Sequence, residues 1–124
     1  MITKHREGII IGSACEAGEV FRAVVAGKPD EEIKKIASFY DYLEIQPVIN
    51  NRFMIDAGIV ESNDDLRNFN LKVVEIADAL GKPVVATTDA HYDKPESAIY
   101  RNILMAGMGS VSYTHLTLPT TERV

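Results

Sequence analysis

The chain has 124 residues, 46% of them hydrophobic and 25% charged, which fits one globular domain or a piece of a larger protein and excludes a disordered or fibrous chain. Thirteen Lys and Arg against 18 Asp and Glu leave a formal net charge of -5, which argues against a segment that binds nucleic acid through bulk positive charge. No apolar run approaches the roughly 20 residues needed to cross a bilayer and no secretory signal is readable, so we expect a cytoplasmic protein without a role in a membrane.

The N-terminal third predicts one strand followed by two helices. Residues 7–13 form a short apolar run bounded by glycine, which is typical of a strand buried on both faces. Residues 16–26 carry apolar side chains at helical spacing, and Gly27 supplies a stop. Residues 29–40 repeat the helical spacing, with acidic residues in the first turn where the helix dipole favours them.

The rest of the chain continues to alternate strands with helices. Residues 42–46 alternate apolar and polar side chains, which predicts a second strand. After a loop through Asn50-Asn51 and residues 56–58, Ser62 or Asn63 is expected to cap a long helix that ends at Gly81. Residues 84–88 predict a third buried strand, followed by a loop and a last helix over about residues 95–106.

This order of elements predicts an α/β fold with about three parallel strands and covering helices. Strands separated by helices of this length are joined by crossovers, and crossovers produce parallel pairing. Three strands would leave open sheet edges and one uncovered face. We therefore interpret the chain as a segment of a larger α/β barrel or doubly wound sheet.

The last stretch, residues 110–124, does not continue this pattern. It is rich in threonine and shows no helical periodicity, and a strand through residues 111–115 is the minor alternative. The run VSYTHLTLPT resembles the translation of a transposase adapter used to build sequencing libraries. We therefore expect a partial domain over residues 1–109 and a non-native, disordered tail over residues 110–124.

Two side chains with metal-binding chemistry directly follow the third predicted strand. In extended chain, Asp89 and His91 project to the same side, which makes them a workable ligand pair for zinc, manganese or iron. Active sites of β/α barrels collect at this end of the strands. The alternative is that Asp89 caps a turn and His91 lies in a loop without a ligand role, since short motifs are frequent by chance.

Cys15 follows the first predicted strand and therefore belongs to the same end of the sheet as Asp89 and His91. It is the only cysteine, which rules out an internal disulfide and fits a reducing compartment. A thiolate, a carboxylate and an imidazole at one place form a candidate metal site. Two alternatives stay open: Cys15 as a small buried apolar residue, and a Cys/His/Asp triad, which no oxyanion-hole motif accompanies.

Glu44 and Gln46 share one face of the second predicted strand. On that face they would point into the mouth of a barrel, as substrate contacts or as hydrogen-bond partners of metal ligands. The alternative, which we favour, is a polar layer hydrogen-bonded inside the barrel. We find no glycine-rich phosphate-binding loop in the sequence, so nothing in it predicts nucleotide binding by such a loop.

Three ordered blocks of the sequence resemble a known family. They are residues 8–21 (GIIIGSACEAGEVF), 39–47 (FYDYLEIQP) and 83–92 (PVVATTDAHY), and residues 98–106 continue the match. The blocks are similar to the C-terminal part of the PHP (polymerase and histidinol phosphatase) domain in PolC-type DNA polymerase III alpha subunits of Gram-positive bacteria. The resemblance covers nearly all of residues 4–109.

The resemblance implies a distorted seven-stranded β/α barrel with a metal cluster at its C-terminal mouth. Cys15, Asp89 and His91 match three of the family's ligand positions, and the site would hold zinc or manganese. The family's other ligands would lie before an inserted exonuclease domain, so this segment is expected to be inactive alone and to have no catalytic residues of its own. The parent would be a magnesium-dependent polymerase, and the implied partners are its exonuclease and polymerase domains, the replisome and DNA.

The alternative function is a self-standing phosphoesterase of the PHP superfamily. Such an enzyme would hydrolyse a small phosphate ester with metal-activated water. It would need a His-x-His motif upstream of this segment and no polymerase domain downstream.

Overall fold

The computed structural model describes residues 1–109, and the predicted tail, with its minor strand alternative, lies outside the described residues. The chain divides into two compact units, residues 1–89 and the residues from Ala90 onward, and each is described by itself. The first unit contains helices α1 to α4 and strands β1 and β2, and the second contains α5. No helix among the described residues is both long and apolar enough to cross a membrane.

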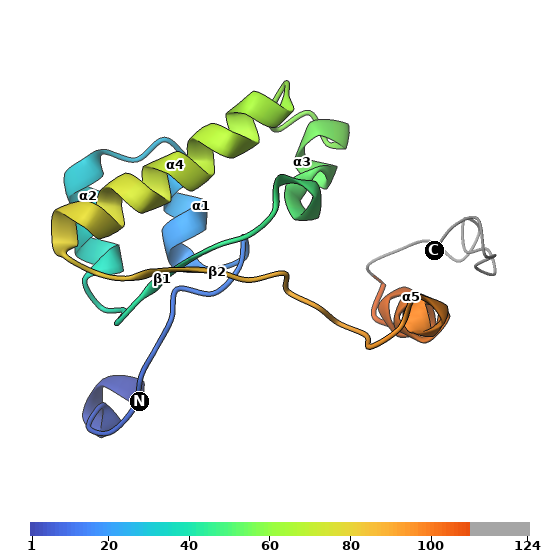
Figure 1. Ribbon diagram of the computed structural model, residues 1–124, viewed down its shortest axis with the longest axis horizontal. Coiled ribbons are helices and arrows are strands. Elements are labelled where there is room, and N and C mark those ends of the chain that lie inside the picture. The colour runs from blue at the N-terminus through green and yellow to red at the C-terminus, as the bar shows by residue number, and fades with distance from the viewer. Residues whose placement is uncertain (110–124) are drawn as a thin grey trace. The chain divides into compact units, whose positions relative to one another are not determined.

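Helices cover one side of a small parallel sheet in the first unit. β1 (Leu43–Ile45) pairs in parallel with β2 (Val84–Ala86). Figure 1 shows α1 (Glu19–Val25), α2 (Asp30–Ala37) and α4 (Asn63–Leu80) together on one side of these strands. The predicted α/β pattern of two helices, a strand, a long helix and a strand is therefore confirmed for residues 19–86.

The long helix α4 contributes four buried residues to the core, and local signals set both of its ends. The Ser62 hydroxyl accepts a hydrogen bond from the backbone N–H of Asp65, and the Asp65 carboxylate accepts one from the backbone N–H of Ser62, which makes a capping box. Gly81 ends the helix at φ 65°, a left-handed conformation that favours glycine. The largest fully buried side chains come from α1, α2, β1 and α4: Val20, Ile33, Leu43, Leu66, Val73 and Ile76.

The prediction of a buried first strand over residues 7–13 is wrong. Gly12 makes one isolated parallel bridge to Tyr42 in place of a ladder. Ile9 is 48% exposed and Ile10 is 79% exposed. A strand buried on both faces needs a layer on each side, and in the first unit the helices lie on only one side of the strands (Figure 1).

The third predicted strand is shorter and more exposed than expected. β2 ends at Ala86 instead of residue 88, and Val85 is 40% exposed, because β2 has β1 on one side and no further strand within residues 1–109. The described residues therefore form a two-stranded parallel sheet with helices, not a three-stranded sheet.

Two short helical segments replace part of the predicted loop between β1 and α4. They are the 3-10 helix η2 (Val48–Asn51) and the one-turn helix α3 (Phe53–Asp56). Neither is long enough to carry an apolar stripe that a sequence pattern can register. Met54, 6% exposed, fixes α3 to the core.

The two ends of the described chain carry further helical segments. A 3-10 helix, η1 (Ile2–His5), begins the first unit. In the second unit the 3-10 helix η3 (Pro95–Ser97) leads directly into α5 (Ala98–Gly107), which confirms the last predicted helix.

Arg6 and Asp41 tie the N-terminal segment to the turn before β1. The Asp41 carboxylate accepts a hydrogen bond from the backbone N–H of Ile11 at 2.7 Å and pairs with the Arg6 guanidinium at 3.0 Å. Arg6 also donates to the carbonyl of Phe39 at 2.8 Å and lies over the Phe39 ring. The hydrogen bond from Ile11, followed by the contacts with Arg6, lowers the pKa of Asp41 below its ordinary 3.8.

We expect Asp41→Asn to destabilise the chain at neutral pH and to lose that effect in acid. A lowered folded-state pKa stabilises the fold above the ordinary value of 3.8, and this contribution disappears as the pH falls through the folded-state pKa. Urea unfolding midpoints from about pH 7 to about pH 3 measure this dependence. Asp78→Asn, at an exposed position on α4, is the control. A constant difference between Asp41→Asn and wild type across this range would contradict the assignment.

Two leucines of α4 provide a matched test of the core. Leu66 is 1% exposed and Leu71 is 58% exposed. We expect Leu66→Ala to reduce the free energy of unfolding by about 2–5 kcal/mol, and Leu71→Ala to change it by less than about 0.5 kcal/mol. Equal effects in urea unfolding would show that α4 does not pack on the sheet as described.

Candidate metal centre

Three potential metal ligands converge at one place in the first unit. One ligand atom each from Cys15, Glu16 and Asp89 lies within 4.8 Å of the others. Cys15 and Glu16 are half-buried, and Asp89 is exposed. Ligands on one tetrahedral zinc ion, at about 2.0–2.3 Å from it, lie roughly 3.3–3.8 Å apart, so side-chain movements of about 1 Å would bring all three onto one ion.

A tight turn between the Gly12 bridge and α1 presents Cys15 and Glu16. Ala14 takes φ 62°, and the N–H of Gly18 donates to the Cys15 carbonyl at 2.9 Å. A side chain at Gly18 would meet the Ser13 carbonyl at 2.3 Å, so the turn requires glycine there. This turn occupies residues that were predicted as helix, and it explains why α1 begins at Glu19 and not at residue 16.

Asp89 ends the first unit, three residues beyond β2. Its φ of 53° is left-handed, so the chain is not extended at Asp89, in contrast to the extended chain assumed in the prediction for Asp89 and His91. His91 belongs to the second unit, which is described separately. The structure thus brings Cys15 and Asp89 together, adds Glu16, and describes His91 only within its own unit.

Glu44 and Gln46 form hydrogen bonds with each other and with residues near the two ligand-bearing loops. The Gln46 amide donates to a Glu44 carboxylate oxygen at 3.1 Å, and the Thr87 hydroxyl donates to the same oxygen. The backbone N–H of Glu44 donates to the Ser13 hydroxyl at 2.9 Å. Gln46 is 5% exposed. These contacts join residues that flank Cys15 on one side and Asp89 on the other.

The three ligand types define what this group can bind. A thiolate is a soft ligand that suits zinc better than magnesium, whereas carboxylates suit zinc, manganese and magnesium. Glu16 was not among the ligands predicted from the sequence. Nothing in the spacing of Glu16 distinguished it from the acidic first turn of a helix.

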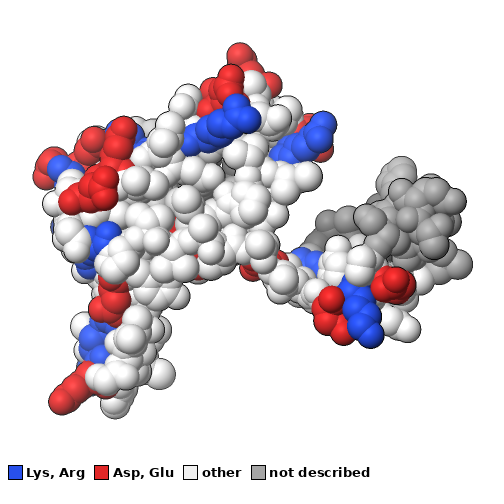
Figure 2. Space-filling view, viewed as in Figure 1, with Lys and Arg blue, Asp and Glu red and all other residues white. Residues whose placement is uncertain are grey.

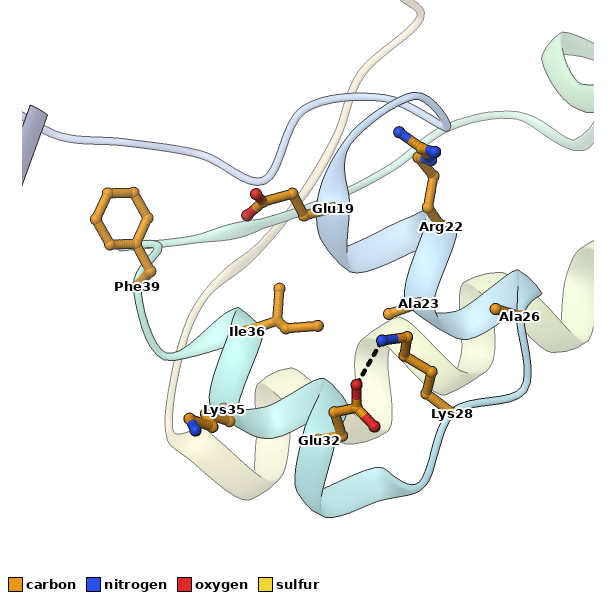
Figure 3. Close-up of a pocket in the computed structure, with 9 residues that line it drawn as sticks. All are labelled: Glu19, Arg22, Ala23, Ala26, Lys28, Glu32, Lys35, Ile36 and Phe39. Carbon is orange, nitrogen blue, oxygen red and sulfur yellow. Dashed lines mark hydrogen bonds and ion pairs between the residues drawn. The ribbon is translucent and has the colours of Figure 1, made fainter. Parts of the chain in front are cut away.

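A separate pocket lies between α1 and α2. In Figure 3, Lys28 and Glu32 meet across it as an ion pair, with Arg22 and Lys35 near its rim. Glu19, which also lines the pocket, accepts a hydrogen bond from the Tyr40 hydroxyl at 3.0 Å. Burial, and then this bond, raise the pKa of Tyr40. Cys15, Glu16 and Asp89 do not line this pocket, whose charged lining residues are three cations and two carboxylates.

Charged side chains on the face of the first unit seen in Figure 2 do not form a basic stripe. Figure 2 shows Lys and Arg interspersed with Asp and Glu around an uncharged middle of its visible face. Several of these charges pair with a neighbour on the same helix, such as Arg67 with Asp64 at 2.7 Å. This face therefore lacks the continuous positive surface that a nucleic acid backbone requires.

Comparison with known proteins gives one consistent result. The chain is 53% identical over 109 residues to the DNA polymerase III PolC-type of Clostridium perfringens, which is 88% of this chain and 8% of that protein. It is 45% identical over 111 residues to the protein of that name from Halalkalibacterium halodurans and 41% identical over 111 residues to that from Bacillus subtilis. In both, the match covers 90% of this chain and 8% of the relative.

The chain thus spans about 8% of the length of these relatives. No protein-family model matches it, and neither does any solved structure.

Proposed function

We propose that this chain is a fragment of a PolC-type replicative DNA polymerase and that it forms part of the PHP domain of that enzyme. The observation that supports the parent most directly is the 53% identity over 109 residues with a PolC-type polymerase. The parent would add deoxynucleotides to a primer with magnesium, through domains outside this chain. Its exonuclease and polymerase domains, the replisome and DNA would be the partners, in the cytoplasm.

Within that enzyme, the proposed role of this segment is a structural metal site. Cys15, Asp89 and His91 are its ligands, with Glu16 as a further donor, because Cys15, Glu16 and Asp89 already converge within 4.8 Å. Zinc or manganese would bridge the turn after Gly12 and the segment after β2, and the thiolate favours zinc. A metal in such a site can also activate water for phosphoester hydrolysis. The role that we propose for this site is nevertheless architectural.

Zinc is expected to stabilise the reduced chain through Cys15 and Asp89. At a free zinc concentration 100 times the dissociation constant, the gain is about 2.7 kcal/mol, and a chelator reverses it. We expect Cys15→Ala and Asp89→Asn to abolish the gain, whereas Asp56→Asn, at an exposed position on α3, preserves it. Thermal unfolding with and without zinc measures this. An equal gain in Cys15→Ala would exclude the site.

The parent enzyme can be identified by a long genomic sequencing read across both ends of this reading frame. We expect an exonuclease domain upstream and a polymerase domain downstream. We also expect the sequence after residue 109 to differ from the threonine-rich stretch, because we propose that residues 110–124 are not native. A stop codon after residue 109 with a His-x-His motif just upstream would instead indicate a self-standing phosphoesterase.

A further inference from the structure

The two loops that carry the potential ligands both contain a residue in an unfavourable backbone conformation. Ala14 and Asp89 have φ of 62° and 53°, in the left-handed region, which costs alanine roughly 1–2 kcal/mol and which aspartate tolerates better. Such conformations persist where surrounding contacts hold them. A different residue holds each of the two loops, so their contacts can be changed one at a time.

The Cys15 loop is held by Ser13. The backbone N–H of Ser13 donates to the Tyr42 carbonyl at 3.2 Å, and the Ser13 hydroxyl accepts from the backbone N–H of Glu44 at 2.9 Å. Ser13 is 4% exposed, so water does not compete for these bonds. The Cys15 loop is thereby attached to the start of β1.

The Asp89 loop is held by a different residue, Asn50. The Asn50 amide, on η2, donates to the carbonyl of Thr88 at 2.8 Å, which is the carbonyl of the peptide bond that precedes Asp89. The same nitrogen lies 3.4 Å from the Gln46 side-chain oxygen, a second acceptor. Gln46 is itself fixed, because its backbone carbonyl accepts from Asn70 of α4 at 2.9 Å.

We infer that Asn50 is a positioning residue for Asp89 in the proposed metal site. It fixes the Thr88–Asp89 peptide, and this fixes the direction in which the Asp89 carboxylate approaches Cys15 and Glu16. The inference rests on the proposed metal site. Asn50 does not contact the ion; it acts through the peptide bond next to a ligand, as the hydrogen-bond partners of metal ligands do.

The test is a titration of the reduced chain with Co²⁺, which stands in for zinc and gives a thiolate-to-metal absorption band. Asn50→Leu removes both donated hydrogen bonds with little change in size. We expect its dissociation constant for Co²⁺ to rise roughly 10- to 100-fold. The thiolate band at saturation should persist, because Ser13 holds the Cys15 loop independently. Asn68→Ala, at an exposed position on α4, should bind like wild type.

Urea unfolding of the metal-free variants separates positioning from general stability. Weaker Co²⁺ binding with an unchanged midpoint supports the inference. If Asn50→Leu binds Co²⁺ as tightly as wild type, the positioning role of Asn50 is wrong but the metal site is not affected. If wild type does not bind Co²⁺, the proposed metal site is wrong as well. Asn50→Ala replaces Asn50→Leu if the latter does not fold. If both variants unfold, or if the thiolate band disappears with the affinity, Asn50 supports the fold and the positioning role is wrong.

Discussion

The parallel pairing of β1 with β2 is the constraint on which the rest of the first unit depends. Parallel strands end at the same edge of a sheet, and the chain must cross over between them. α4 makes that crossover, and at 18 residues it spans about 27 Å. The bridge between Gly12 and Tyr42 adds a third segment in the same direction. Cys15 and Asp89, far apart in the sequence, therefore meet beyond the ends of these segments.

The longer helices α1, α2, α4 and α5 and the strand β1 could be predicted because their signals are local. A capping serine, a left-handed glycine and an apolar stripe all lie within one element, and α4 follows from Ser62, Gly81 and the spacing between them. The first strand could not be predicted correctly, because its burial depends on neighbours that a local apolar run does not reveal. Ile10, in the middle of that run, is 79% exposed.

Some residues of the candidate site could likewise be predicted from the sequence, and others could not. Cys15 and Asp89 could be selected because each follows a predicted strand, and the rule that parallel strands end at one edge needs no side-chain detail. Glu16 and Asn50 could not be selected from the sequence. The role of Glu16 depends on a turn, and the role of Asn50 depends on one hydrogen bond to the carbonyl of Thr88. The left-handed conformation of Asp89 was equally unpredictable, since aspartate adopts both extended and left-handed backbone and nothing local selects between them here.

The central claim is that strand pairing places Cys15 beside Asp89 before any metal binds. Asp89→Cys tests it directly, because the chain contains one cysteine and the variant two. Mild oxidation of the native variant should produce an intramolecular disulfide rapidly, and oxidation in urea should produce it far more slowly. Native oxidation that yields only free thiols or linked dimers would contradict the account, because the two loops would then lie apart.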